Sequence, residues 1–454
     1  MNKVKIQKNV NYIVEIEKLV YQGSGMASID GFKVFVPNGV PGDIVEIRVY
    51  KKNRDYAQAR ILNFVKKSPL RKEAICRHYN HCGGCQVQDV SYQDQVLLKT
   101  SILQDLLQRF YPQLKEKMLP IIPAGTDIYY RNKMEYSFGL DDDGIYVGLK
   151  ERGRFDSVIK LGTCYLQSEL ANKIRCWVGV FFSDKTASIW DYHKTEGFLR
   201  HLVVRHSKSF DEYLINLVVS EYREDLLKEF AQKLVEEFPQ VKTVLLTVNN
   251  SQGDSVFSED IRILEGNGFL TEKLGDINYK ISPQSFFQTN SKQAEILYQK
   301  IVEIAELKKT DMVMDLYCGT ASIGIFLSKY VKAVIGVEEN EFAIKDGEEN
   351  IKNNNVDNVK LIAGRVKNVL KFNEFKADCV VLDPPRSGMV PKALKRVIEL
   401  DIEKIVYVSC NPTTMIRDLV VMNEAGYEVE VIQPVDMFPN TFHIELIARC
   451  IKRS

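Results

Sequence analysis

MVMDLYCGTASIGI at residues 312–325 is the stretch that decides the fold class of this chain. It begins as a short apolar strand, continues into a turn that contains a glycine and ends as the start of an apolar helix. A second strand follows in KAVIGVEEN at 332–340 and places Glu338 at its end, 23 residues after Asp315. A strand, a turn, a helix and a carboxylate at the next strand end are typical of a Rossmann-like α/β domain.

The glycines of this turn narrow the class of ligand. Gly319 and Gly324 do not match the G-x-G-x-x-G spacing that brings a backbone close to a pyrophosphate. The acidic strand end still suits a ribose, whose hydroxyl groups carboxylates bind. The pattern therefore favours a cofactor with a ribose and no diphosphate, and S-adenosylmethionine is the usual one.

Two more apolar strands end in polar residues. VVLDPPRSGM at 380–389 ends in a loop whose two prolines fix the backbone, so this loop holds Asp383 and Arg386 rigidly. KIVYVSCNP at 404–412 ends in Cys410, at the carboxyl edge where open α/β sheets bind their ligands. Cysteines beside core strands are also commonly structural, so this segment alone leaves a catalytic and a structural role open.

The end of the chain supplies a candidate base for this thiol. PVDMFPNTFHIEL at 434–446 contains His443 and Glu445 two residues apart, so a strand places both side chains on one face. A thiol and a carboxylate at neighbouring strand ends can act as nucleophile and base.

The motifs quoted above, together with FFQTN at 286–290, span the C-terminal part of the chain. Their residues and their order along the chain resemble those of the S-adenosylmethionine-dependent RNA uracil-5-methyltransferases. The resemblance implies that Cys410 is the nucleophile and Glu445 the general base. One departure is Arg365 in AGRVKNVL, where many relatives have an acidic residue near the adenine of the cofactor. Ser322 stands where the family often has Asn. The resemblance implies cofactor contacts from Gln288, Tyr317, Ser322, Glu338 and Asp383.

The chemistry of uracil explains why these residue types are needed. Carbon 5 of uracil is a poor nucleophile, and attack of a thiolate on carbon 6 converts the ring to an enolate whose carbon 5 can accept a methyl group. A base must then remove the carbon 5 proton so that the thiolate can leave, and Cys410 and Glu445 fill these roles. A free thiol, with a pKa of about 8.5, is only slightly ionised at neutral pH, and Arg386 is a candidate cation that increases this fraction. His443 can orient Glu445, contact the RNA or be a hydrogen-bonded structural residue.

The cysteines indicate a second site. Three of them cluster as Cys76-x5-Cys82-Gly-Gly-Cys85, and Cys164 in LGTCYL is the candidate fourth ligand. Four thiolates suit zinc as well as iron–sulfur clusters, but the spacing lacks the paired C-x2-C halves of ordinary zinc ribbons. It resembles the iron–sulfur segment of the ribosomal-RNA branch of the family, which implies a four-iron four-sulfur cluster with zinc as the alternative. We expect Cys176, Cys379 and Cys450 in the core.

The N-terminal segment carries a nucleic-acid signal that the net charge of +1 hides. Residues 1–75 contain 14 Lys and Arg against 7 Asp and Glu. Residues 12–50 show alternating strands separated by Gly and Pro turns, which is typical of a small all-β barrel. The segment resembles the OB-like TRAM domain of RNA-modifying enzymes. A charge run alone is commonly a solvated face, but on such a barrel the basic residues are expected to contact phosphates.

The middle of the chain predicts an α+β domain. Strands are expected at 197–207, 212–220 and 241–249, with an amphipathic helix at about 222–238 between the last two. The domain boundaries are therefore 1–67 for the barrel, 68–282 for the α+β domain with the cluster loop, and 283–454 for the Rossmann-like methyltransferase domain. A helix at about 92–122 is expected to pack on the catalytic domain, as in relatives.

These observations predict a three-domain α/β enzyme that methylates carbon 5 of a uridine in 23S rRNA, because the cysteine cluster and the barrel favour the ribosomal branch. The target base must leave its stack to reach Cys410. Two alternatives stay open: the same chemistry on the T-loop of tRNA, and a non-catalytic RNA-binding assembly factor that retains the cofactor fold. Nine cysteines, no signal-like start and no apolar run near 18 residues favour a reduced, cytoplasmic setting without a membrane, and we expect a monomer.

Overall fold

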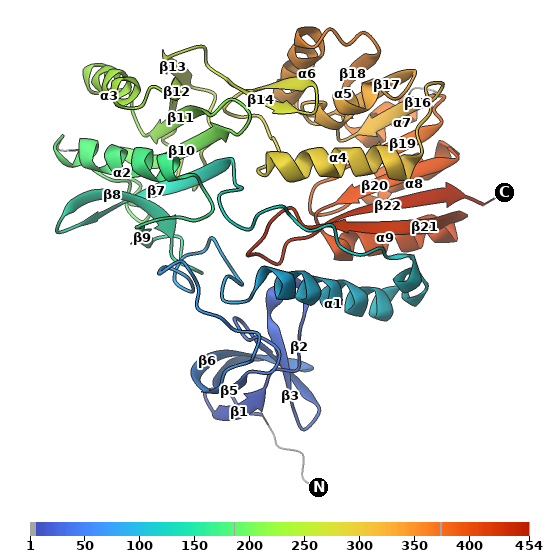
Figure 1. Cartoon of the computed structure of the whole chain (residues 1–454), viewed down its shortest axis with the longest axis horizontal. Helices are drawn as coiled ribbons and strands as arrows, with labels where there is room; N and C mark the ends of the chain where they lie inside the picture. The colour runs from blue at the N-terminus through green and yellow to red at the C-terminus, as the bar shows by residue number, and fades with distance from the viewer. Residues whose placement is uncertain (1–5, 186, 373–374, 454) are drawn as a thin grey trace.

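Three large β-sheets, each with its own apolar core, follow one another along the described part of the chain and form three lobes, and a two-stranded sheet lies in sequence between the second and the third (Figure 1). The computed structural model describes residues 6–185, 187–372 and 375–453. The N-terminal lobe lies at one end, and the helix that follows it runs beside the C-terminal sheet (Figure 1). Within these ranges, no helix is both long and apolar enough to cross a lipid bilayer.

The N-terminal lobe is a curved six-stranded sheet with the order β1-β5-β6-β4-β3-β2. Alternate residues of its strands, such as Val45, Ile47 and Val49, point into one apolar core, and the residues between them face outward. This alternation is why the segment forms strands around a small core. The strands are β1 (Asn11–Glu15), β2 (Lys18–Leu19), β3 (Gly25–Ile29), β4 (Phe32–Val36), β5 (Ile44–Lys52) and β6 (Tyr56–Lys66), with a 3-10 turn η1 (Tyr21–Gly23) between β2 and β3.

The central lobe is a mixed seven-stranded sheet with the order β13-β12-β11-β10-β7-β8-β9. Helices α2 (Glu169–Ser183) and α3 (Glu224–Glu237) pack their apolar faces on it. The three strands and the helix expected here are therefore confirmed within two residues. The strands are β7 (Lys133–Asp141), β8 (Gly144–Lys150), β9 (Val158–Lys160), β10 (Leu199–Ser207), β11 (Glu212–Val219), β12 (Val241–Val248) and β13 (Ile261–Glu265).

The prediction that Cys176 lies in the core is wrong. Cys176 is exposed, whereas Cys379 and Cys450 are buried as expected. The reason is the period of α2, which places Cys176 on the same solvent-facing stripe as Lys173 and Val180, three and four residues away.

The C-terminal lobe is a seven-stranded sheet with the order β18-β17-β16-β19-β20-β22-β21, in which β22 alone runs antiparallel to its neighbours. Apolar clusters cover both faces of the sheet, as a doubly wound sheet requires. The Rossmann-like fold is confirmed. Its elements are β16 (Met312–Leu316), α5 (Ser322–Ser328), β17 (Ala333–Glu338), α6 (Glu341–Asn353), β18 (Val359–Ala363), α7 (Val366–Phe372), β19 (Cys379–Leu382), α8 (Pro391–Glu399), β20 (Lys404–Ser409), α9 (Pro412–Glu424), β21 (Tyr427–Val435) and β22 (Glu445–Lys452), preceded by the hairpin β14 (Leu270–Leu274) and β15 (Ile277–Ile281) and by α4 (Ser291–Ala305).

Helix α1 (Tyr92–Phe110) packs on the C-terminal lobe although the central lobe lies between them in sequence (Figure 1). Lys99 Nζ donates to Asp436 Oδ1 at 2.7 Å, and both side chains are 0 % exposed. The helix is shorter than the expected 92–122, because Tyr111 precedes Pro112 and a residue before proline disfavours the helical conformation. A 3-10 segment, η2 (Pro112–Lys117), follows it, and the chain then bonds to the backbone of β21.

Candidate active site

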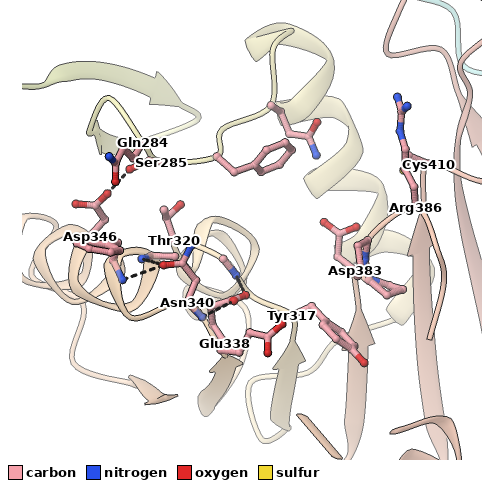
Figure 2. Close-up of a pocket in the computed structure, with 18 of the residues that line it drawn as sticks. Gln284, Ser285, Tyr317, Thr320, Glu338, Asn340, Asp346, Asp383, Arg386 and Cys410 are labelled. Atoms are coloured by element: carbon pink, nitrogen blue, oxygen red, sulfur yellow. Dashed lines mark hydrogen bonds between the residues drawn. The ribbon is translucent and has the colours of Figure 1, made fainter. Parts of the chain in front are cut away.

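The carboxyl ends of the parallel strands open onto a cavity of about 1250 Å³ (Figure 2). Polar residues from four neighbouring strand ends line it, as the sequence predicts for a ligand site of an open α/β sheet. Cys410 and Arg386 lie on one side of the close-up, and Glu338, Asn340 and Asp346 lie on the other (Figure 2). Eight candidate site residues predicted from the sequence line this cavity: Gln288, Tyr317, Glu338, Asp383, Arg386, Cys410, His443 and Glu445.

The backbone conformation and close packing of the turn after β16 require glycine at two positions. Tyr317, Gly319 and Ala321 all have positive φ, so the chain turns sharply between the strand and α5. Asp315 Oδ2 accepts a hydrogen bond from the Gly324 N–H at 2.8 Å, and a Cβ atom at Gly324 would lie 3.0 Å from the same oxygen. The motif therefore keeps a glycine where the backbone of α5 must approach a buried carboxyl group.

Glu338 is fixed between this turn and the next helix. Its Oε2 accepts from the Gly319 N–H at 3.0 Å, and its Oε1 accepts from the Asn340 N–H at 2.8 Å. The Asn340 side chain in turn caps α6 by accepting from the Phe342 and Ala343 N–H groups. A carboxylate held in this way at a strand end can accept hydrogen bonds from the hydroxyl groups of a ribose.

The sheet register places Cys410 opposite Glu445. Ser409 of β20 pairs with Leu446 of the antiparallel β22, so the next residue of one strand meets the preceding residue of the other. The Asn411 Nδ2 donates to the Arg386 carbonyl oxygen at 2.8 Å and ties the cysteine turn to the Asp-Pro-Pro-Arg loop. The thiol, the carboxyl group and the guanidinium therefore share one end of the cavity.

The electrostatics of this end favour protonated acids when no ligand is bound. Burial raises the pKa of Glu445 to about 8, and nearby Asp383 adds to the shift. Burial also raises the pKa of Asp383 to about 7 and that of Cys410 to about 11. The Arg386 guanidinium acts in the opposite direction on both Cys410 and Glu445. A cation placed in this cavity would therefore stabilise ionised forms that burial disfavours.

His443 lies beside Arg386, and Nδ1 of the histidine is 3.4 Å from a guanidinium nitrogen of the arginine. Burial and this arginine lower the pKa of His443 to about 4. The imidazole is consequently neutral at physiological pH and can accept a hydrogen bond.

Ser322 lies outside the set of described residues that line the cavity. Its hydroxyl group is 2.9 Å from the Tyr298 hydroxyl group, and its carbonyl oxygen accepts from Tyr279. Arg365 lines the cavity and pairs with Glu339 at 3.0 Å.

Several aromatic residues that the sequence reasoning did not assign also line the cavity. Phe286 is 70 % exposed, and Phe342 and Phe257 are more than half exposed. Phe286 belongs to the FFQTN motif, which could have indicated it. Phe257 lies in the loop between β12 and β13, and no local pattern distinguishes it.

The four clustered cysteines are free thiols that lie near one another. Burial raises the pKa of both Cys82 and Cys85, and the negative charges that Cys164 and Cys76 would carry as thiolates raise these pKa values further. The Gly84 N–H lies 3.3 Å from Cys82 Sγ. Within residues 6–185, 187–372 and 375–453, no group of three or more His, Cys, Asp and Glu side chains is arranged to hold a metal ion.

Comparison with known proteins places this geometry in a family. The model of the family described as tRNA (Uracil-5-)-methyltransferase matches residues 91–449, and the TRAM domain model matches residues 11–62. The chain belongs to the RNA uracil-5-methyltransferase family.

Relatives of this RNA uracil-5-methyltransferase match nearly its whole length. An "Uncharacterized RNA methyltransferase" of Halalkalibacterium halodurans is 34% identical over 99% of both chains. A protein of the same description from Caldanaerobacter subterraneus is 37% identical over 96% of this chain and 97% of its own. The crystal structure of Pyrococcus abyssi tRNA (uracil-54, C5)-methyltransferase in complex with S-adenosyl-L-homocysteine matches with a TM-score of 0.78 and 30% identity, over 97% of this chain and 99% of that one.

Proposed function

We propose that this protein transfers the methyl group of S-adenosylmethionine to carbon 5 of a uridine in 23S rRNA. The observation that carries the proposal is the placement of Cys410 opposite Glu445 at one end of the cavity whose other end holds Glu338 and the β16 turn. A candidate nucleophile, a candidate base and a carboxylate suited to a ribose thus face one cavity.

The residues present fit the cofactor. Asp315 is 0 % exposed, and its Oδ1 has no hydrogen-bond partner within the described residues. Burial raises the pKa of both Asp383 and Glu445, and the charge of Asp383 raises that of Glu445 further; a sulfonium cation would offset these shifts. Gln288, Tyr317, Glu338 and Asp383 would hold the cofactor. Ser322, which the resemblance also implies as a cofactor contact, is the first residue of α5 and lies outside this lining, so its part would be to hold the turn through its bonds to Tyr279 and Tyr298.

The reaction then follows from the residues at the other end. When bound, S-adenosylmethionine supplies an electrophilic methyl group. The Cys410 thiolate attacks carbon 6 of the uracil, a C–S bond forms, and the electrons of the ring double bond move to the enolate. Once carbon 5 carries the methyl group, Glu445 removes the proton from this carbon. The electron pair restores the double bond as the C–S bond breaks and Cys410 is regenerated.

Arg386 would promote the reaction by stabilising the ionised form of Cys410. Its guanidinium donates a hydrogen bond to Cys410 and lowers the pKa of this thiol. It therefore increases the thiolate fraction before attack and stabilises the thiolate again after release.

The choice of 23S rRNA rests on the cysteine loop and the N-terminal barrel, which resemble those of the ribosomal branch. A second candidate is the same reaction on tRNA, because the similar Pyrococcus abyssi enzyme is a tRNA (uracil-54, C5)-methyltransferase. In either RNA the target uridine must leave its stack to enter the cavity beside Cys410.

We further propose that Cys76, Cys82, Cys85 and Cys164 hold a four-iron four-sulfur cluster with a structural part. The charges of Cys76, Cys82 and Cys164 all act on the pKa of Cys85, so the four thiols lie near one another. Their spacing in the sequence lacks the paired C-x2-C halves of ordinary zinc ribbons. The Gly84 N–H at Cys82 Sγ would stabilise a thiolate ligand. No step of the methyl transfer needs electrons, so the cluster would fold the loop rather than react.

The experiment that tests the proposal incubates anaerobically purified protein with S-adenosylmethionine tritiated in the methyl group and unmodified 23S rRNA or tRNA transcripts. Label in 5-methyluridine from 23S rRNA alone, absent in Cys410→Ala, supports the proposal. Label only in tRNA would leave the chemistry standing and overturn the substrate. No label in either RNA, with S-adenosylmethionine bound, would favour an RNA-binding assembly factor instead.

A further inference from the structure

The nine residues that connect β21 to β22 form a loop that is buried along almost its whole length. Residues 436–444 have an irregular backbone, and within them Asn440 is 1 % exposed and Phe442 is 6 % exposed. The backbone groups of a buried loop need hydrogen-bond partners outside regular secondary structure. This loop carries His443 and leads directly into Glu445, so these partners bear on the active end of the cavity.

The middle of the loop is bonded to the N-terminal part of the chain. Every described hydrogen bond from residues 438–442 to another segment goes to residues 86–130. Gln86 makes two of these bonds. Its N–H donates to the Asn440 carbonyl oxygen at 2.7 Å, and its Oε1 accepts from the Phe442 N–H at 2.9 Å. The main chain and the side chain of this one residue thus fix the path of the loop.

Gln86 can act as an anchor because its own position is fixed. It belongs to the cysteine loop, residues 76–88, and directly follows Cys85. The carbonyl oxygen of Cys85 accepts a hydrogen bond from the Arg152 guanidinium, and the side chain of Val87 is fully buried. Both neighbours of Gln86 are therefore held, and the cysteine loop presents this glutamine to the catalytic lobe from a fixed support.

The ring of Phe442 fixes the same point of the loop from the barrel. A Cβ atom at Gly23 of the turn η1 would lie 1.7 Å from Phe442 Cδ2, so the ring fills the space that a side chain there would need. Three residues later, Glu445 begins β22, whose pairing with β20 brings it opposite Cys410. The place of Glu445 is thus set by the strand on one side and by the loop that Gln86 holds on the other.

We propose that Gln86 is a positioning residue for the candidate base, so that the cysteine loop governs the last step of the reaction. The inference rests on the proposed roles of Cys410 and Glu445. In that step Glu445 takes the proton from carbon 5 of the methylated ring, the electron pair restores the ring double bond, and the bond from carbon 6 to Cys410 Sγ breaks. Attack of the thiolate and methyl transfer precede this step and do not need Glu445.

The proposal is tested with Gln86→Leu in the full chain, on whichever of the 23S rRNA and tRNA transcripts the unaltered protein methylates. Leucine keeps the main-chain bond to Asn440 and removes the acceptor for the Phe442 N–H. We expect kcat to fall by about 10- to 100-fold, because a misplacement of about 1 Å can slow a reaction by that much. The dissociation constant of S-adenosylhomocysteine should stay unchanged. More of the protein should be trapped as a methylated protein–RNA adduct on denaturing gels, because release of Cys410 becomes the slow step.

Two further variants separate positioning from folding. Gln86→Glu keeps an acceptor oxygen at the same reach and should restore most of kcat. Gln88→Leu is the matched control, because Gln88 is buried in the same loop and its Oε1 accepts from the Cys76 N–H at 3.0 Å, within the loop. This control should not raise the share of adduct. A variant that only unfolds the cysteine loop should lower methylation and adduct together.

Unchanged kcat and adduct in Gln86→Leu would overturn the inference. A share of adduct that falls in step with methylation, or that Gln88→Leu raises equally, would overturn it as well. If Gln86→Leu does not fold, Gln86→Asn, which is one methylene shorter and still polar, takes its place with the same expected result. The proposed function would fail differently, since the unaltered protein would then methylate neither RNA or Cys410→Ala would still methylate.

Discussion

Three buried carboxyl groups, two that line the cavity and Asp315 beneath its turn, ionise less readily than ordinary acids, and burial is the main cause for each. Asp315, Asp383 and Glu445 are withdrawn from water, and two of them also feel a neighbouring carboxylate. Their pKa values rise to about 7, 7 and 8. The unliganded site is therefore partly protonated at neutral pH, and a cationic ligand is the one that it is built to receive.

This charge balance predicts proton release when the cofactor binds. A sulfonium cation favours the ionised carboxylates and lowers their pKa values, so S-adenosylmethionine should bind more tightly as the pH rises from about 6 to about 8. S-adenosylhomocysteine lacks the positive charge and should show a much weaker dependence. Calorimetric titrations in buffers of different ionisation enthalpy measure the protons released. Equal release for the two ligands would contradict this assignment.

The strand-end residues were predictable from sequence, whereas the contacts between lobes were not. Glu338 and Cys410 follow apolar runs whose length and punctuation indicate parallel strands, and parallel strands bring their carboxyl ends together. The turn at Gly23 meets Phe442 through packing between two separately folded lobes, which no local pattern encodes. Cys176 was misplaced for a related reason, since its residue type suggested burial and the helix period decided otherwise.

At the scale of elements, helix α1 is the connection between the barrel and the catalytic sheet. Lys99 of α1 forms an ion pair with Asp436, which directly follows β21 and lies 337 residues further along the chain. Asp436 also accepts a hydrogen bond from the Tyr92 hydroxyl group of α1 at 3.0 Å. The Lys99 ammonium additionally donates to the Phe438 carbonyl oxygen. These contacts orient the segment that leads to His443 and Glu445.

Removing this lysine should destabilise the catalytic lobe. Lys99→Met leaves Asp436 buried without its counter-ion, which costs about 3–5 kcal/mol. Thermal unfolding followed by circular dichroism should give a clearly lower Tm. Lys395→Met is the control, because Lys395 is an exposed lysine of α8 whose pair with Glu399 contributes at most about 1 kcal/mol. The same Tm in both variants would contradict a structural part for the buried pair.

At the scale of the whole molecule, positive charge gathers on the barrel while the net charge stays at +1. Arg71 is an exception among the basic residues there, because it pairs internally with Asp43 and Asp89. The exposed basic residues between positions 48 and 72, on the last two barrel strands and just after them, are Arg48, Lys51, Lys52, Arg54, Arg60, Lys66, Lys67 and Lys72.

This distribution predicts a salt-dependent affinity for RNA. Each phosphate that the protein no longer neutralises should reduce the slope of log K against log salt by about 0.7 to 0.9, so Lys51→Ala with Arg54→Ala should flatten the slope by up to about twice that value. Lys228→Ala on α3, which lies in the central lobe away from the barrel, is the control (Figure 1). Fluorescence anisotropy at several salt concentrations measures the slope. An unchanged slope in the barrel variant would show that these residues do not contact phosphates.

The most direct test of covalent catalysis at this site uses Glu445→Gln, which should allow attack and methyl transfer but not removal of the carbon 5 proton. After incubation with S-adenosylmethionine and the RNA substrate, denaturing gels should show a protein–RNA adduct that persists without reducing agent. Mass spectrometry of the digested adduct should place a methylated nucleotide on the peptide that contains Cys410. No adduct, or an adduct on another cysteine, would contradict the account of how this cavity methylates uracil.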